Sequence, residues 1–305
     1  MPAVETRTSL GYCKLCELAD FRDPDLRELI RDMAGVGPER PDYPDGEEHR
    51  KPWEVAMSAR ALRDFGALHE GAEILGVGAG SEATIFWLTR HVKRVFATDL
   101  YLTEDSWSEL DSGAGMLHAP EGETTLDWNP RRLVVQHMNA LELRYEDDSF
   151  DGIFSSGSIE HFGALDDIHK SVEEMYRVVR PGGVVALATE FRLAGPPPGL
   201  PGTALFDQDE LRRVLLEGLD WELPSQLDFS ISEETTAAPV DFDSLVELSL
   251  AEPTLWMKLK DALGREVKLE ATAIRHLPTP YPHIVLRKGE HLWTSVFVTL
   301  IKPDA

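Results

Sequence analysis

Three glycines at alternate positions, Gly76, Gly78 and Gly80, follow directly on an apolar run and precede a helical pattern. Without a Cβ, residues in this arrangement let the backbone turn tightly from strand to helix and approach a ligand closely. One strand–helix unit later the apolar run Val95–Thr98 ends in a carboxylate, Asp99. An acid at that place can hold the two hydroxyls of a ribose. The spacing therefore predicts a site for a nucleoside-bearing cofactor.

Strand and helix patterns alternate around these residues, which predicts an α/β fold with an open, mostly parallel sheet. Strands are expected near residues 73–77, 94–98, 132–136, 151–155, 184–190, 221–231 and 293–301. Helices are expected near residues 24–33, 53–65, 81–91, 166–179, 207–217 and 243–263.

The same patterns divide the chain into four parts. Residues 1–70 read as a helical lead-in and 71–231 as the core. Residues 232–292 form an insertion between the last two strands, either as a cap or as a homodimer contact, and 293–305 return to the core. Residues 101–130 interrupt the alternation and are expected to help shape a functional site.

Composition narrows the class of partner. The 305 residues carry 54 acidic and 30 basic side chains and a formal net charge of −24, a field that repels nucleic acids and anionic membranes. No apolar run approaches the roughly 20 residues that cross a bilayer. The N-terminal residues have no signal-peptide pattern, so a cytoplasmic location is expected.

The two cysteines, Cys13 and Cys16, are separated by two residues. A structural zinc usually needs four ligands, and no second pair of cysteines completes such a set. We therefore expect packing residues first, with redox or metal use as alternatives, and we predict no metal site.

Further motifs occur in a fixed order after Asp99. They are His137–Leu141, Phe150–Phe162 with its Glu160-His161 pair, and Met175–Leu187 with Arg180-Pro181-Gly182-Gly183. In this order the chain resembles the class I S-adenosylmethionine-dependent methyltransferases, specifically the methyltransferase-11-like group. The resemblance implies a Rossmann-like, seven-stranded doubly wound sheet whose last strand is antiparallel. Arg50–Glu54 and Ser158–Gly163 add a narrower likeness to glycan- or small-molecule-associated members.

The resemblance also implies which residues contact the cofactor, S-adenosyl-L-methionine. The glycine motif would wrap its methionine part, but Gly76 replaces the usual acid and Glu82 the usual third glycine. Glu82 or Glu54 is then expected to supply the missing carboxylate. The full set of expected cofactor-binding residues is Gly76, Gly78, Gly80, Glu82, Asp99 for the ribose, Asn139 and Ala140 for the adenine, and Ser156.

Two interpretations are open for Arg50 and Lys51. They pair with the cofactor carboxylate, or they form a solvated charge cluster. His161 follows the fourth strand of the core, beside the crevice of a doubly wound sheet. A histidine there suits a general base that removes the proton of an alcohol. Its alternative role is to shape the pocket.

The predicted function is methyl transfer from S-adenosyl-L-methionine, as an O-methyltransferase of a small molecule or of a sugar or glycan hydroxyl. Two alternatives remain open at this point. Gly78 to Ala83 also fits the fingerprint of a nicotinamide-dependent oxidoreductase, with Asp99 about 20 residues on. A non-catalytic, cofactor-binding partner subunit is the other.

Overall fold

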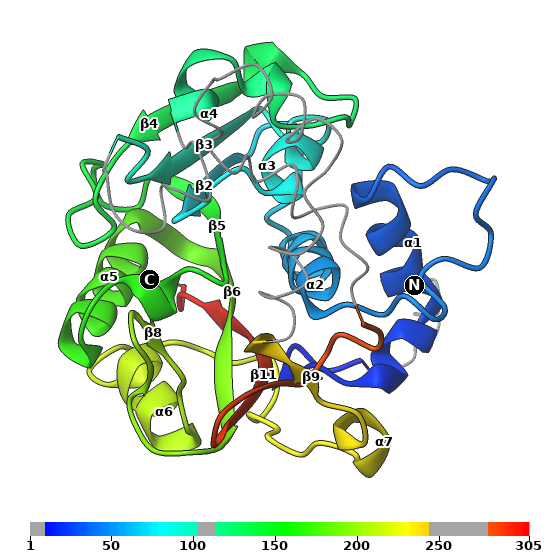
Figure 1. Cartoon of the computed structure of the whole chain (residues 1–305). Helices are drawn as coiled ribbons and strands as arrows, with labels where there is room; N and C mark the ends of the chain where they lie inside the picture. The colour runs from blue at the N-terminus through cyan, green and yellow to red at the C-terminus, as the bar shows by residue number, and fades with distance from the viewer. Residues whose placement is uncertain (1–9, 103–113, 244–279, 305) are drawn as a thin grey trace, which may run out of the picture.

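The computed structural model describes residues 10–102, 114–243 and 280–304 (Figure 1). Within them a single large sheet has nine strands in the order β4-β3-β2-β5-β6-β11-β10-β9, with β1 also paired to β11. The strands are β1 (Cys13–Leu15), β2 (Glu73–Val77), β3 (Arg94–Asp99), β4 (Leu133–His137), β5 (Phe150–Ser156), β6 (Val179–Ala194), β9 (Val240–Asp241), β10 (Leu286–Lys288) and β11 (His291–Ile301). A separate hairpin joins β7 (Gly199–Leu200) to β8 (Thr203–Ala204).

Strands β4, β3, β2, β5 and β6 are mutually parallel, and β11 runs antiparallel to β6. The Rossmann-like α/β fold with an antiparallel late strand is thereby confirmed. The chain moves outward from β2 to β3 and β4 and then returns to β5 on the other side of β2. A crevice opens at such a switch point, at the carboxyl ends of the strands.

Helices cover both faces of the sheet (Figure 1). Neighbouring residues of a strand point to opposite faces. Ile74 accordingly packs in one core cluster, with the buried sides of α1, α2 and α3, and Leu75 packs in the other, with α5 and α6. The helices are α1 (Pro24–Met33), α2 (Arg50–Asp64), α3 (Ala83–Leu88), α4 (Ala114–His118), α5 (Leu165–Val178), α6 (Gln208–Leu216) and α7 (Glu233–Thr236). The described residues also form four short 3-10 turns: η1 (Leu18–Arg22), η2 (Pro120–Gly122), η3 (Pro130–Arg132) and η4 (Ile159–His161).

Local sequence signals explain where two of the expected helices begin. Asp23 accepts a hydrogen bond from the Leu26 amide at the start of α1, and Pro24 occupies the first turn. Asp207 and Glu210 form a capping box at the start of α6. Such caps satisfy amides that have no partner within the helix.

Three strands of the sheet, β1, β9 and β10, were not expected, and one expected strand is not formed. Residues 221–231 make only isolated bridges, at Glu222 and Asp228. The edge of β11 that they would pair with is occupied by β1 instead, with Cys13 opposite Val298. Pro224 also removes a backbone donor from the segment.

The predicted helix near 243–263 and much of the excursion 101–130 lie outside the described residues. The four-part division of the chain stays a prediction.

Both cysteine side chains are buried, and burial raises the pKa of each thiol. The longest described helix, α2, has 15 residues, and none of the described helices is long and apolar enough to cross a membrane.

Candidate functional site

The glycine motif forms the turn from β2 into α3, and two of its residues need glycine for conformational reasons. Gly78 and Gly80 have φ values of +61° and +49°, in the left-handed region that side chains disfavour. A Cβ on Gly78 would also lie 2.7 Å from Cβ of Ser158, which follows β5. The turn therefore packs closely against the segment that follows β5. Ser158 Oγ links the two by donating a hydrogen bond to the Gly78 carbonyl at 2.5 Å.

Gly76 is a glycine because there is no room for a side chain. A Cβ at this position would lie 2.5 Å from Cζ of Phe154 and 2.8 Å from Cβ of Ala79. Phe154 is fully buried in the core. An acid could not occupy position 76 in this packing, so any carboxylate for the cofactor has to come from elsewhere.

Asp99 ends β3 beside the glycine turn. Its Oδ2 accepts a hydrogen bond from the Gly80 amide at 2.8 Å, and its Oδ1 accepts one from the Leu100 amide at 2.6 Å. Tyr101 supports the same turn, because its hydroxyl donates to the Gly80 carbonyl at 2.8 Å. The structure thus brings together the two features that predicted a nucleoside site.

Asn139 and Ala140 follow β4, next to Asp99. The Met138 amide donates to the Asp99 carbonyl at 2.9 Å, which joins the ends of β3 and β4. The Asn139 side chain is exposed and its Oδ1 accepts from the Leu141 amide at 2.9 Å, whereas Ala140 is buried. Both residues lie at the same edge of the sheet as the glycine turn.

Ser156 ends β5 and is buried. Its Oγ lies 3.3 Å from Oγ of Ser58 on α2, so the strand end and that helix are in polar contact. The structure therefore places Ser156 at the end of β5, against α2.

A buried group of charges lies where α2 crosses the ends of β5 and β6. Arg50 Nη1 is 2.7 Å from Glu190 Oε1 and 3.1 Å from Glu54 Oε1, and all three side chains are less than a tenth exposed. Ser295 Oγ on β11 also donates to Glu54. Although burial favours the neutral acid, Arg50 and Lys51 hold the pKa of Glu190 below its ordinary value. The solvated-cluster reading of Arg50 is therefore wrong.

Lys51 belongs to the same group but is more accessible, with 44% of its side chain exposed. Its Nζ is 3.0 Å from Glu54 Oε2 and 3.4 Å from Glu190 Oε1. A Cβ on Gly157, the residue after β5, would collide with this ammonium. The Lys51 ammonium therefore lies against the end of β5, the strand that pairs with β2.

Glu82 precedes α3, and its side chain is half-buried. Its Oε2 is shielded from solvent and finds no hydrogen-bond donor in the described part of the chain. Burial raises its pKa well above the ordinary range; the charges of Glu54 and Asp99 act in the same direction and that of Lys51 opposes them. The charges of both Asp99 and the buried charge group therefore act on the Glu82 carboxyl.

His161 lies in the turn η4 and is oriented by the β7–β8 hairpin. Its Nδ1 is 2.8 Å from the Gly202 carbonyl oxygen, and Thr203 Oγ1 lies 3.5 Å from the same nitrogen. A carbonyl only accepts, so Nδ1 carries the proton and the neutral ring presents Nε2 as a proton acceptor.

Glu160 lies beside that acceptor nitrogen. Its Oε1 is 3.9 Å from His161 Nε2, and its Oε2 accepts a hydrogen bond from Thr189 Oγ1 at 2.7 Å. The side chain is buried, and burial together with the charge of Glu190 raises its pKa. A proton arriving on His161 would favour the ionised form of Glu160, so the two groups stabilise each other's charged state.

Glu190, Ser295 and Gly202 belong to the site but were not expected from the sequence. Glu190 had one usable signal, an acid directly after the buried run Val184–Thr189. Ser295 and Gly202 had no such signal in the sequence. Their roles depend on the pairing of β11 with β6 and on the fold of the β7–β8 hairpin.

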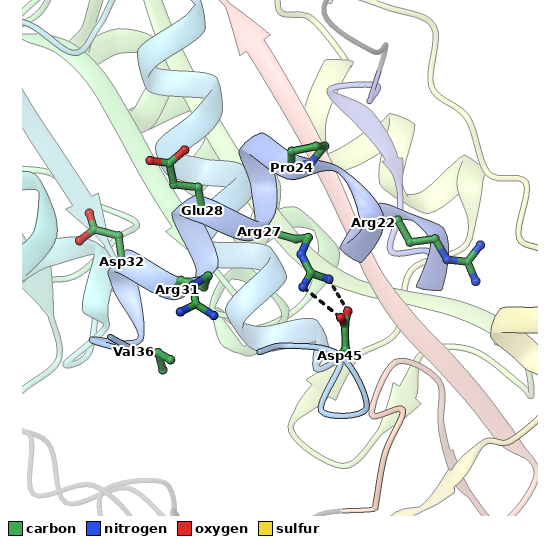
Figure 2. A pocket seen from close by; sticks show the side chains of 8 residues that line it. All are labelled: Arg22, Pro24, Arg27, Glu28, Arg31, Asp32, Val36 and Asp45. Atoms are coloured by element: carbon green, nitrogen blue, oxygen red, sulfur yellow. Dashed lines mark hydrogen bonds and ion pairs between the residues drawn. The ribbon is translucent and has the colours of Figure 1, made fainter. Parts of the chain in front are cut away.

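A separate hollow lies on the outer side of α1 (Figure 2). Its arginines are engaged within the protein. Arg27 is paired with Asp45, and Arg31 donates to the carbonyls of Gly37 at 2.8 Å and Tyr43 at 3.0 Å. None of its lining residues comes from the strand ends; they are Arg22, Pro24, Arg27, Glu28, Arg31, Asp32, Val36 and Asp45.

In the described residues no group of three or more histidine, cysteine, aspartate or glutamate side chains is arranged to hold a metal ion. Other histidines that could act as a base have different surroundings. His137 Nδ1 accepts from the Leu102 amide at 3.2 Å, and His283 is stacked on His49. His276 lies outside the described residues.

Residues 75–187 match the family model described as "Methyltransferase domain". Three curated relatives are similar over shorter parts of their length. A chloroplastic 2-methyl-6-phytyl-1,4-hydroquinone methyltransferase 1 of Oryza sativa is 28% identical over 135 residues, 44% of this chain and 36% of that protein. The 27-O-demethylrifamycin SV methyltransferase of Amycolatopsis mediterranei is 28% identical over 137 residues, 45% of each chain. The demethylmenaquinone methyltransferase of Oceanobacillus iheyensis is 40% identical over 77 residues, 25% of this chain and 30% of that protein. The chain thus spans less than half the length of these relatives.

Among solved structures, the YcgJ protein of Bacillus subtilis has a TM-score of 0.47 at 16% identity, covering 83% of this chain and 99% of that one. Phosphoethanolamine N-methyltransferase 2 of Haemonchus contortus, in complex with S-adenosyl-L-methionine, has a TM-score of 0.47 at 16% identity, covering 95% and 61%. The strand order given above remains the basis of the fold assignment.

Proposed function

Residues 75–187 form a methyltransferase domain of the class I, S-adenosylmethionine-dependent family, and from this we propose that the protein O-methylates a small molecule or a sugar or glycan hydroxyl. The observation that carries the proposal is the hydrogen bond from the Gly80 amide to Asp99 Oδ2. It joins the glycine turn and the ribose acid into one nucleoside site, inside the segment that matches the family.

The chain's own residues fit the cofactor. Gly78 and Gly80 keep side chains away from the turn, and Asp99 is oriented by two amides to accept from ribose hydroxyls. The buried Oε2 of Glu82 has no hydrogen-bond donor among the residues that the structure describes, and a cationic group of a ligand would supply one. Asn139, Ala140 and Ser156 complete the proposed set of contacts.

When bound, S-adenosyl-L-methionine supplies a methyl group on a positively charged sulfur. The protein then has to align an acceptor oxygen with that carbon, and such alignment contributes most of the rate in reactions of this kind. It also has to take the hydroxyl proton. His161 Nε2 is the proposed base, because the other ring nitrogen, Nδ1, is hydrogen-bonded to the Gly202 carbonyl. The nearby Glu160 carboxyl would stabilise the imidazolium.

One relative's name supports an oxygen acceptor, since the Amycolatopsis protein is described as a 27-O-demethylrifamycin SV methyltransferase. The two relatives whose names specify quinone-type compounds support a small-molecule acceptor. A carbohydrate hydroxyl remains within the proposal, because the residues 158–163 around His161 carry the narrower sequence likeness.

Calorimetry with S-adenosylhomocysteine and, separately, with NAD tests the cofactor. We expect S-adenosylhomocysteine to bind and NAD not to bind. Binding of NAD alone would overturn the proposal. A matched variant, Asp99→Asn, should weaken S-adenosylhomocysteine by about tenfold or more, the loss of one hydrogen bond to a charged group.

The acceptor is then sought with methyl-labelled S-adenosyl-L-methionine and a panel of phenols, quinols, nucleotide sugars and glycans. Label should pass to an oxygen of one class, identified by mass spectrometry of the product. Transfer exclusively to nitrogen or carbon would retain methyl transfer but refute the oxygen acceptor.

A further inference from the structure

The cofactor's amino-acid end carries an ammonium and a carboxylate, and the family's usual acid for it is missing at Gly76. Packing against Phe154 excludes any side chain there. Two glutamates near the glycine turn were expected to take its place, Glu82 and Glu54. Their surroundings differ in a way that decides between them.

Glu54 already has its partners. Its Oε1 is 3.1 Å from Arg50 Nη1 and also accepts from Ser295, and its Oε2 is 3.0 Å from Lys51 Nζ. Glu82, in contrast, has a buried Oε2 without a donor in the described part of the chain. A buried carboxylate in that condition is costly unless a cation reaches it. Glu82 is therefore the glutamate that requires a ligand.

Lys51 offers the complementary charge. A lysine ammonium has three donors, and Glu54 and Glu190 engage two of them, which leaves the third for a ligand. The ammonium stands against Gly157, and Gly157 follows β5, the strand that pairs with β2. Lys51 therefore lies at the same sheet edge as the glycine turn and is accessible from outside.

We propose that Glu82 and Lys51 together hold the amino-acid end of the cofactor, with Glu82 Oε2 accepting from its ammonium and Lys51 Nζ donating to its carboxylate. Glu54 and Glu190 are positioning residues that aim Lys51. The inference rests on the proposed function and adds to it the means by which this chain compensates for Gly76.

Electrostatics favour this pairing over the alternatives. The buried group contains the carboxyls of Glu54, Glu160 and Glu190 against the two cations Arg50 and Lys51. A carboxylate ligand brought here without an ammonium would add to the negative charge. A zwitterion places its positive end on Glu82 and its negative end on Lys51, so each of its charges meets an opposite charge.

The test compares two probes that share the nucleoside and the thioether but differ at this end. S-adenosylhomocysteine has the amino-acid end and 5′-methylthioadenosine lacks it. Binding of each is measured by calorimetry to the unsubstituted protein, Glu82→Gln and Lys51→Met. We expect each variant to lose about tenfold to 100-fold in affinity for S-adenosylhomocysteine, the scale of a hydrogen bond to a charged group, and less than about twofold for 5′-methylthioadenosine.

Two controls bracket the result. Asp99→Asn should weaken both probes by a similar factor, because both have the ribose. Glu73→Gln, at the opposite end of β2 and paired with Lys93 on the surface, should weaken neither. Thermal unfolding without ligand checks integrity. Glu82→Gln should not lower Tm, because the carboxyl oxygen Oε2 that it replaces is buried and has no hydrogen-bond donor in the described part of the chain.

The inference is overturned if Glu82→Gln and Lys51→Met bind S-adenosylhomocysteine normally, or if they weaken both probes equally, which is the pattern of general damage to the site. In either case the proposed function would stand. If the unsubstituted protein binds neither probe, the proposed function fails and this inference fails with it.

Discussion

His161 Nδ1 lies 2.8 Å from the carbonyl oxygen of Gly202, so the hairpin of β7 and β8 determines which ring nitrogen of the histidine carries the proton. The hairpin lies between β6 and α6 in the sequence, and it contacts the histidine ring through this backbone carbonyl and the nearby Thr203 hydroxyl. A backbone acceptor cannot be lost by a change of side chain. The orientation of His161 is therefore built into the fold of the hairpin.

Replacing His161 should separate chemistry from cofactor binding. We expect His161→Ala to lower kcat by about 100-fold to 10,000-fold, the usual contribution of a positioned general base. Affinity for S-adenosylhomocysteine should stay within about twofold, because His161 is not among the proposed cofactor contacts. Turnover is measured with labelled cofactor and affinity by calorimetry.

The matched control is His169→Ala. His169 is also held through Nδ1 by a carbonyl, that of Val214 at 3.1 Å, but it lies on α5. Its replacement should leave kcat unchanged. If His161→Ala and the unsubstituted protein turned over equally fast, His161 would not be the base, and its role would be to shape the pocket.

Gly76→Ala should destabilise the protein. The new Cβ would lie 2.5 Å from Phe154 Cζ and 2.8 Å from the Ala79 Cβ, and the phenyl ring is fully buried, so it has no space to move into. Overpacking of this kind costs about 1–3 kcal/mol in the free energy of unfolding, which urea denaturation measures.

Gly122→Ala serves as its control, because no atom lies within 4 Å of the Cβ that would be added. It should change the free energy of unfolding by less than about 1 kcal/mol. If Gly76→Ala were as stable as Gly122→Ala, the steric reason for the missing acid would be wrong.

The sequence predicted the glycine turn and the strand that ends at Asp99, because the determinants of both are local. Gly78 and Gly80 need φ values open to glycine, and the apolar run before Asp99 marks the end of a strand; both properties can be read within a few residues. The order of strands then brings the two together.

The buried charge group could not be read in that way. Arg50 and Glu190 are 140 positions apart, and charged residues on a helix are usually solvated. Only the packing of α2 across the ends of β5 and β6 turns Arg50 into a buried cation. The strand expected at 221–231 was wrong for a related reason, since β1 pairs with β11 and comes from the other end of the chain.

Arg50→Met should be strongly destabilising, because it leaves two buried carboxylates, Glu54 and Glu190, without their main counter-charge. Removing one partner of a buried ion pair costs about 3–5 kcal/mol. The double variant Arg50→Met/Glu190→Gln should recover part of that loss, since one of the uncompensated charges is then gone. Urea denaturation of both variants checks the order, and a double variant less stable than the single one would contradict it.

The stacked histidines His49 and His283 should make stability depend on pH. Their ring centroids are 4.1 Å apart, and they tie the start of α2 to the segment before β10. Burial lowers the pKa of His283 from 6.5 to about 4 and that of His49 to about 2, so both are neutral in the folded protein. The unfolded chain binds these protons more readily, so stability is fully present above pH 6.5 and falls as the pH decreases towards 4.

For His283 the shift corresponds to at most about 3 kcal/mol lost between pH 6.5 and 4. Urea denaturation at several pH values should show a steeper decline for the unsubstituted protein than for His283→Gln, in which this proton cannot bind. His69→Gln, which alters an exposed histidine, should decline like the unsubstituted protein. Parallel curves for all three proteins would show that the stacked pair does not contribute to acid sensitivity, and would leave the buried carboxyls and their ion pairs as its source.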